Sequence, residues 1–270
     1  MLETYTDVKA WVESLATEEK GVWILTGPAD AARGRFYYAL FEHLLSRGKQ
    51  GLSLERKPFA HVRGLQQVNV VERPMSDAVA EGVEQAPDIL GVSEMEAGRD
   101  AELAFLAGAR LPVLAVLTSY DSLSALGWLL ERRLRSPLKA GLCKGILALR
   151  AFDGLCEHCA EHYALKPADA KILAAWGFSE TPLFASAGCD ACRSGGGDAP
   201  PRVVVPEVLD AMEHLPPFLA AAERAPALAA DARRDEMMKS HKPLILRRGL
   251  ELAAARKVDA RSVLRAFPAI

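Results

Sequence analysis

The sequence lacks both a long apolar segment and a recognisable leader. No apolar run approaches the roughly 20 residues that a helix needs to cross a bilayer. The first residues, Met1 to Asp7, contain no basic stretch followed by an apolar one, so they do not resemble a secretory signal. We therefore expect a chain without a transmembrane segment that stays in the cytoplasm.

An excess of charge of either sign is also missing. Lys and Arg number 33 against 35 for Asp and Glu, which gives a formal net charge of −2. Such a balance offers no general attraction for nucleic acid or anionic lipid, so we expect no nucleic-acid partner. With 50% hydrophobic and 25% charged residues, the composition is that of a folded globular protein and not of a disordered chain.

Short apolar runs alternate with amphipathic patterns through the first 150 residues. The runs that predict buried strands are 22–26, 52–54, 89–92, 113–117 and 146–149. Apolar residues spaced by three and four predict helices over 8–17, 35–47, 77–84 and 101–109. This alternation favours an α/β layer fold with a mostly parallel sheet.

The pattern changes after Arg150. The next stretch holds four of the five cysteines, several turn residues, a predicted helix over 168–176 and a predicted short strand over 203–205. Everything after Glu207 is predicted to form helices interrupted by prolines. The sequence therefore predicts three parts, which are a core of residues 1–150, a small insert of residues 151–206 and a C-terminal helical subdomain of residues 207–270.

The loop after the first predicted strand has the place and the first glycine of a phosphate-binding loop. The working pattern is Gly, four residues, Gly-Lys-Ser/Thr, and it corresponds here to Gly27 through Gly34. Ala32 stands at the second glycine, Arg33 at the lysine and Gly34 at the hydroxyl that holds magnesium, while Asp30 adds a carboxylate that repels phosphate. ATP and Mg²⁺ are therefore doubtful ligands. The alternative is that the loop is simply a turn between a strand and a helix.

Two cysteine pairs have the spacing of metal-binding knuckles. They are Cys156 with Cys159 and Cys189 with Cys192, each separated by two residues. Because cytoplasmic thiols are kept reduced, the pairs predict four thiolates around a structural Zn²⁺, with no open position for catalysis. A redox or empty thiol cluster is the alternative, and His162 is a candidate to replace one cysteine.

Several blocks of the sequence, in the same order, resemble the C-terminal motor domain of type II secretion and type IV pilus-assembly ATPases. Residues 54–70 are similar to the family's acidic box, with Glu55 at its first glutamate but Arg56 and Phe59 at its other two acids. Residues 87–95 resemble the family's Walker B strand, and Glu94 stands at the glutamate that handles metal and water.

Further matches follow downstream. Residues 113–121 resemble the His box, but Thr118 replaces its histidine and only Asp121 is retained. Residues 145–159 are similar to the family's stretch that leads into the first cysteine pair, and 202–209 to the segment after the second. The resemblance runs from about residue 8 to residue 267 and does not extend to the family's N-terminal domains, which we expect to be absent.

The resemblance implies a RecA-like P-loop NTPase core, a small zinc-binding insert and C-terminal helices. Because the replaced residues are those that would bind and hydrolyse ATP, it implies a pseudo-ATPase in which Glu55 and Glu94 are vestigial. Such a protein would assist assembly or regulation of a secretion or pilus machine, peripherally at the inner membrane. Its implied partner is a motor ATPase paralogue or an inner-membrane platform protein, in a homo- or hetero-oligomer. The alternative is a functional ATP-binding or ATP-hydrolysing motor with an atypical loop.

Overall fold

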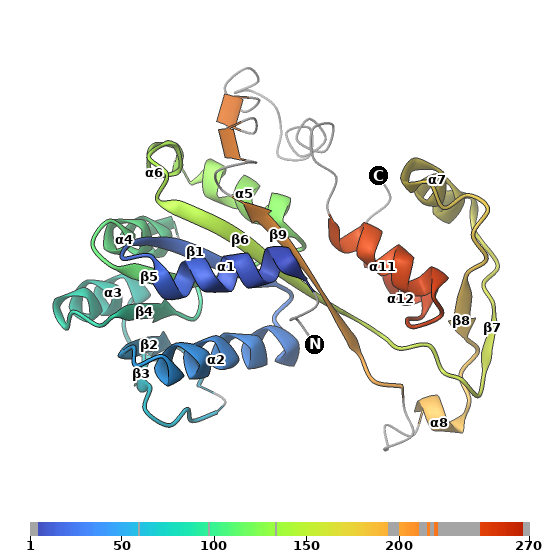
Figure 1. The fold of residues 1–270 in the computed structure, drawn as a ribbon, viewed down its shortest axis with the longest axis horizontal. Helices are drawn as coiled ribbons and strands as arrows, with labels where there is room; N and C mark the ends of the chain where they lie inside the picture. Colours follow the sequence, from blue (N-terminus) through green and yellow to red (C-terminus); the bar gives the residue numbers. More distant parts are fainter. Residues whose placement is uncertain are drawn as a thin grey trace. The chain divides into compact units, whose positions relative to one another are not determined.

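A computed structural model of the chain contains two compact units (Figure 1). The first consists of Met1–Leu149 and Pro206–Pro243, and the second of Arg150–Val205 and Leu244–Ile270. The structure describes residues 5–58, 60–96, 98–132, 134–193, 200–210, 215–216, 219–220 and 244–266.

A seven-stranded sheet forms the centre of the first unit. Its order is β3-β2-β4-β5-β1-β6-β9, and the pairs that join β3 through β6 along it are parallel. Strands β1, β2 and β4 are buried along their whole length, as expected where helices cover both faces of a sheet. The predicted α/β fold with a mostly parallel sheet is confirmed. The strands are β1 (Gly21–Gly27), β2 (Gly51–Glu55), β3 (Gln66–Asn69), β4 (Ile89–Val92), β5 (Pro112–Thr118), β6 (Cys143–Phe152) and β9 (Val203–Asp210).

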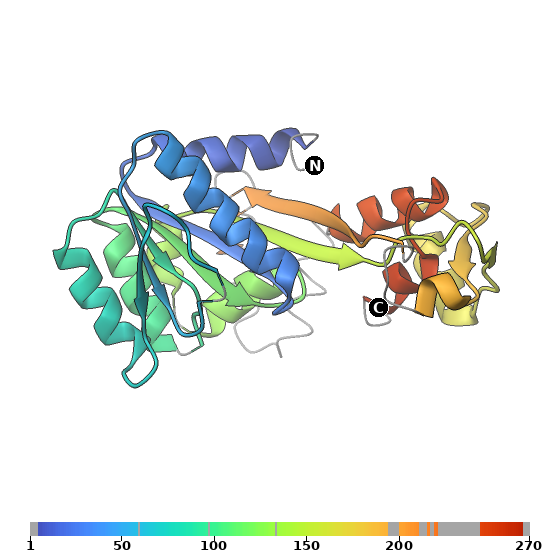
Figure 2. The same ribbon diagram turned by 90° about the horizontal axis from the view of Figure 1, so that it is seen from below.

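Helices pack on both faces of this sheet, and neighbouring residues of β4 show how. A Cβ on Gly91 would lie 2.2 Å from the hydroxyl oxygen of Tyr37 in α2, whereas the side chain of Leu90 lies against Gly82 in α3. Successive strand residues point to opposite faces, so α2 and α3 lie on opposite sides (Figure 2). The helices of this unit are α1 (Thr6–Thr17), α2 (Ala31–Ser46), α3 (Met75–Glu84), α4 (Gly98–Gly108), α5 (Ser122–Glu131) and α6 (Arg135–Lys139).

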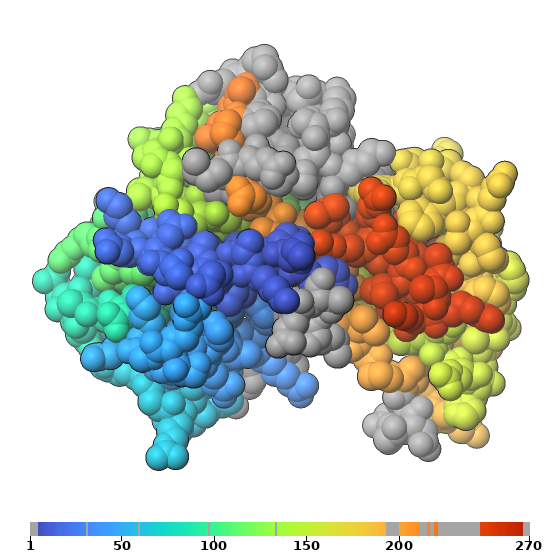
Figure 3. Space-filling model, viewed as in Figure 1, coloured from blue at the N-terminus to red at the C-terminus, as the bar shows by residue number. Residues whose placement is uncertain are grey.

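Helices α1 and α2 lie next to each other on one face, as the two shades of blue show in Figure 3. An ion pair joins them, with Nη1 of Arg47 2.6 Å from Oε2 of Glu13. Trp11 of α1 is buried over Gly145 of β6, where a side chain would collide with the indole ring. Together these helices cover the strands that carry the loop at Gly27.

The second unit is small and is built around a two-stranded antiparallel sheet of β7 (Ala160–His162) and β8 (Phe184–Ser186). Helix α11 packs on α12, and α12 contacts β8. The helices of this unit are α7 (Pro167–Trp176), α8 (Asp190–Arg193), α11 (Leu244–Ala254) and α12 (Ala260–Arg265).

The structure corrects the helical prediction for the segment that begins at Glu207. Strand β9 continues through Asp210, because Val208 and Leu209 are buried at the edge of the main sheet instead of on a helix. Of the described residues in the range 207–270, those at 207–210 belong to the first unit and those at 244–266 to the second. Within the described ranges, no helix has the length and apolar character required to span a membrane.

Candidate functional site

Strand β1 ends at Gly27, the first residue of the predicted phosphate loop. Gly27 has φ = +141°, a conformation that L residues rarely adopt. A Cβ there would also lie 2.3 Å from the carbonyl oxygen of Leu149 in β6. Glycine is therefore required at this position by the backbone geometry alone, whether or not a nucleotide binds.

Asp30 caps the helix that follows the loop. Its Oδ1 accepts hydrogen bonds from the backbone N–H groups of Ala32 and Arg33, both at 3.1 Å. The first N–H groups of a helix have no partner within the helix, and they commonly bind phosphate. A carboxylate of the protein itself therefore holds two of the donors that a phosphate would use.

Arg33, at the lysine position, is also held by the protein. Its side chain is buried, and Nη1 donates to the carbonyl of Gly27 at 2.8 Å, to Oγ1 of Thr118 at 2.8 Å and to the carbonyl of Leu117 at 3.3 Å. Burial lowers the pKa of Arg33, and the nearby carboxylates of Glu94 and Asp30 oppose this shift. The cation is directed at the loop and at strand β5.

A pocket of about 320 Å³ opens beside the loop. Formally it carries three carboxylates, from Asp30, Glu55 and Glu94, against two cations, from Arg33 and Lys57, which leaves it one negative charge in excess. Its lining residues are Ala29, Asp30, Arg33, Gly34, Tyr37, Tyr38, Glu55, Lys57, Ser93, Glu94 and Val116. The structure thus brings together the predicted residues Asp30, Arg33, Gly34, Glu55 and Glu94.

Glu55 lies at the centre of a buried network. Its carboxylate accepts hydrogen bonds from the Tyr38 hydroxyl, from Oγ of Ser53 at 2.7 Å and from Nε2 of Gln67 at 3.0 Å. The Tyr37 hydroxyl bonds to Ser53, and burial holds the pKa of Tyr37 well above its ordinary value. Nothing in the sequence pattern predicted a role for the two tyrosines, because their contacts depend on how α2 packs on β2.

Two further matched positions, Asp121 and Arg56, have partners within the protein. Asp121 is fully buried and caps α5, where its Oδ1 accepts from the backbone N–H of Ser124 at 2.7 Å. Nε of Arg56 lies 3.6 Å from Oε2 of Glu96. Phe59 lies outside the described residues.

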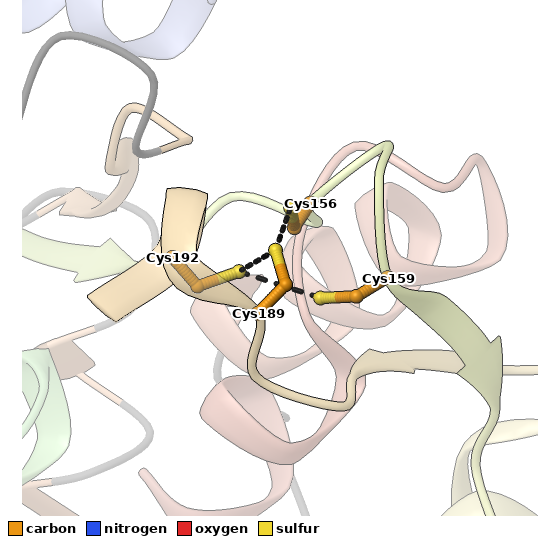
Figure 4. Close-up of side chains that lie close together, drawn as sticks. All are labelled: Cys156, Cys159, Cys189 and Cys192. Carbon is orange, nitrogen blue, oxygen red and sulfur yellow. Dashed lines mark hydrogen bonds between the residues drawn. The ribbon is translucent and has the colours of Figure 1, made fainter. Parts of the chain in front are cut away.

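The four paired cysteines of the second unit converge on one point (Figure 4). Their Sγ atoms all lie within 4.8 Å of one another, and three of the separations are 3.8 Å for Cys156–Cys189, 3.4 Å for Cys159–Cys192 and 3.8 Å for Cys189–Cys192. Sulfur atoms bound tetrahedrally at about 2.3 Å from a zinc ion would lie about 3.8 Å apart. The cluster fits zinc, and in the described part of the chain no histidine belongs to it.

The thiols interact with one another and with the backbone. The N–H of Gly188 donates to Sγ of Cys159 at 3.4 Å and lowers the pKa of that thiol to about 6. The Cys192 thiol bonds to its neighbours, Cys156 foremost, which raises its pKa to about 12. Four crowded thiols cannot all ionise without a cation between them, and a divalent metal ion would favour all four thiolates. The fifth cysteine, Cys143, is buried in the core, and burial raises its pKa to about 12.

Comparison with known proteins agrees with this fold. No family model matches the chain. The chain is 26% identical over 180 residues to the type II secretion system protein E of Pseudomonas aeruginosa, a match covering 65% of this chain and 36% of that protein. It is 26% identical over 229 residues to the type IV pilus assembly ATPase PilB of Thermus thermophilus, covering 80% of this chain and 25% of that one.

Among solved structures, the pilus retraction motor PilT with bound ADP superposes with a TM-score of 0.64 at 14% identity, over 96% of this chain and 64% of that one. The chain therefore shares the fold of this protein. The sequence matches are to secretion and pilus ATPases, which the chain resembles. It spans little more than a third of the length of protein E.

Proposed function

We propose that this chain is a pseudo-ATPase of the secretion and pilus ATPase family. We propose that it assists the assembly or regulation of a type II secretion or type IV pilus-like machine. The observation that carries the proposal is the internal occupation of the phosphate loop. The carboxylate of Asp30 holds the N–H groups of Ala32 and Arg33, and the guanidinium of Arg33 bonds to the carbonyl of Gly27.

Electrostatics adds to this occupation. A carboxylate about 5 Å from one phosphate charge costs on the order of 1 kcal/mol in water and about 3 kcal/mol at an effective dielectric constant of 20. Gly34 has no hydroxyl to hold Mg²⁺, so the compensating cation would lack its usual anchor. A triphosphate would meet a pocket that already has one negative charge in excess.

The proposed role follows from what the chain retains. A folded motor scaffold offers docking surfaces even where its nucleotide site is inactive, so we propose that it pairs with a motor ATPase paralogue or an inner-membrane platform protein. That role places it on the cytoplasmic side, peripheral to the inner membrane. No nucleic-acid partner is proposed, because the net charge of −2 offers no general attraction.

The second candidate is an ATP-binding motor with an atypical loop. The observation in its favour is the pocket itself, which contains Glu94 at the Walker B position and Lys57 as a further cation. The PilT structure that shares the fold contains ADP. In this alternative, Lys57 or a partner's arginine would supply the charge that Arg33 does not.

Calorimetric titration with Mg-ATP and a phosphate-release assay separate the two candidates. We expect no binding tighter than about 1 mM, which corresponds to about 4 kcal/mol, and no turnover above a protein-free blank. Micromolar binding, with hydrolysis abolished in Glu94→Gln, would reject the pseudo-ATPase and support the motor. Affinity purification of the tagged chain then identifies its partner.

We also propose that the cysteine cluster holds structural Zn²⁺ through Cys156, Cys159, Cys189 and Cys192. Four thiolates complete a tetrahedral shell and leave no position for a catalytic water. The metal content of purified protein, measured by mass spectrometry, tests this directly, with one zinc per chain as the expected result.

A further inference from the structure

Asp259 lies between the C-terminal helices and the cysteine cluster. It precedes α12 and caps it, with Oδ1 accepting from the N–H groups of Arg261 at 2.8 Å and Ser262 at 3.3 Å. Its second oxygen, Oδ2, accepts from the N–H of Ser186 at 2.7 Å. The residue is only 8% exposed, so these bonds are largely shielded from water.

Ser186 continues this contact to a cysteine. It is the last residue of β8, and its Oγ accepts a hydrogen bond from the backbone N–H of Cys156 at 3.1 Å. A continuous path of hydrogen bonds therefore runs from the start of α12 through the Asp259 carboxylate and Ser186 to the backbone of the first knuckle. Every step of the path lies within the second unit.

A backbone bridge runs parallel to this path. Gly154 pairs in antiparallel fashion with Val258, and the N–H of Asp259 donates to the carbonyl of Asp153 at 2.8 Å. The N–H of Leu155 donates to the carbonyl of Lys257 at 3.3 Å. The residues immediately before Cys156 are thus fixed to those immediately before α12.

We propose that Asp259 is a positioning residue for the metal centre, and that through it zinc binding and the docking of α11 and α12 stabilise each other. The proposal rests on zinc occupying the cysteine cluster. A metal ion that fixes Cys156 also fixes its backbone N–H, which donates to Ser186. Ser186 in turn orients the Asp259 carboxylate at the start of α12. Coupling of this kind is reciprocal, so the helices must favour zinc to the same extent that zinc favours the helices.

The expected size of the effect follows from the contacts. Outer-shell partners of metal ligands typically change metal affinity by about 10- to 100-fold when they are altered. Asp259 accepts three backbone N–H groups, and an amide in its place has one oxygen and an NH₂ group that repels the remaining donors. We therefore expect Asp259→Asn to bind zinc at least about tenfold more weakly.

The test uses the full chain and zinc competition with a chromophoric chelator. Ser186→Ala removes the bond to the Cys156 backbone without touching the helix cap, and it too is expected to weaken zinc binding by about tenfold. The matched control is Glu251→Gln in α11, whose carboxylate pairs with Arg247 on the surface and is expected to leave zinc affinity within about twofold of wild type.

Hydrogen exchange supplies a readout that does not depend on affinity. Zinc removal is expected to raise the exchange of backbone amides in residues 244–266 of the wild type, and less so in Asp259→Asn, whose helices are already uncoupled. Unchanged zinc affinity in both Asp259→Asn and Ser186→Ala, in protein with native circular dichroism, would overturn the coupling alone. If the wild type bound no zinc, both the coupling and the metal assignment would be wrong. The pseudo-ATPase proposal would be unaffected.

Discussion

The phosphate loop and the cysteine cluster differ in how complete they are. The loop joins a strand to a helix as a phosphate-binding loop does, since β1 ends at Gly27, where φ is positive, and α2 begins directly after Asp30. Its side chains bond to the protein itself, with Asp30 on N–H groups and Arg33 on carbonyls. The cluster, by contrast, presents all four sulfur atoms to one point at separations suited to zinc. This difference supports the proposal that the loop is inactive while the cluster binds zinc.

The largest effect is expected at the cluster. Replacing Cys189 by Ser removes one of four thiolates and should weaken zinc binding by more than about 100-fold, beyond the range of outer-shell changes. Competition with a chelator measures the loss. Cys143→Ala, at the buried cysteine outside the cluster, should leave zinc affinity unchanged and lower the denaturant midpoint instead. Equal zinc affinity in Cys189→Ser and wild type would show that the cluster is not a metal site.

A second effect concerns the backbone of the loop. Gly27→Ala places a Cβ 2.3 Å from the carbonyl of Leu149 and forces a side chain into a left-handed conformation. We expect a loss of about 3 kcal/mol in the free energy of unfolding, measured in urea. Gly48→Ala is the matched control, because its φ is also positive but no atom lies within 4 Å of the added carbon. A loss no larger than that of the control would show that the close approach does not constrain the loop.

The sequence predicted this architecture well where apolar runs are long. Strand β4 was predicted with its observed ends, and β1 and β5 were each predicted one residue short at both ends, because fully buried parallel strands appear as continuous apolar runs. Strand β3 was missed because its residues, Gln66 to Asn69, are mostly polar and lie at the sheet edge. Periodicity cannot detect a strand that has no buried face of its own.

The sequence predicted only part of the residues that line the pocket, and it did not predict their hydrogen bonds. Spacing identified the four cysteines and the loop from Gly27, since both depend on residues close in sequence. It could not show that Asp30 turns back onto the helix N–H groups, nor that Arg33 reaches Thr118, 85 residues away. The Asp30 contact is local and follows from where α2 begins. The Arg33 contact depends on how β1 pairs with β5, which is a property of the folded sheet.

A third prediction restores the loop. Asp30→Gly together with Ala32→Gly, Arg33→Lys and Gly34→Thr frees the helix N–H groups and supplies the lysine and the hydroxyl. We expect Mg-ATP to bind at least about tenfold more tightly than to wild type, by calorimetry.

The single variant Asp30→Asn separates the two causes of weak binding to the loop. Asn is as good a helix cap as Asp, so it keeps the N–H groups occupied while it removes the charge. Its nucleotide affinity should rise above that of the wild type, because the repulsion is removed, but should stay below that of the variant with four substitutions. If Asp30→Asn alone bound Mg-ATP as tightly as the variant with four substitutions, the weak binding of the wild type would be caused by charge repulsion and not by occupation of the N–H groups.

The smallest effect distinguishes the two retained glutamates. Glu55→Gln disturbs a buried carboxylate that accepts from Tyr38, Ser53 and Gln67, and it should cost about 1 to 2 kcal/mol in the free energy of unfolding. Glu94→Gln changes a half-buried side chain beside Arg33 and should stay within about 0.5 kcal/mol of wild type. Urea titration of both variants measures the contrast. A larger loss of unfolding free energy in Glu94→Gln than in Glu55→Gln would contradict this prediction. It would mean that Glu94 in the pocket, and not the buried network of Glu55, stabilises the fold. The expected result, a larger loss at Glu55, would show that this carboxylate stabilises the packing of α2 on the sheet.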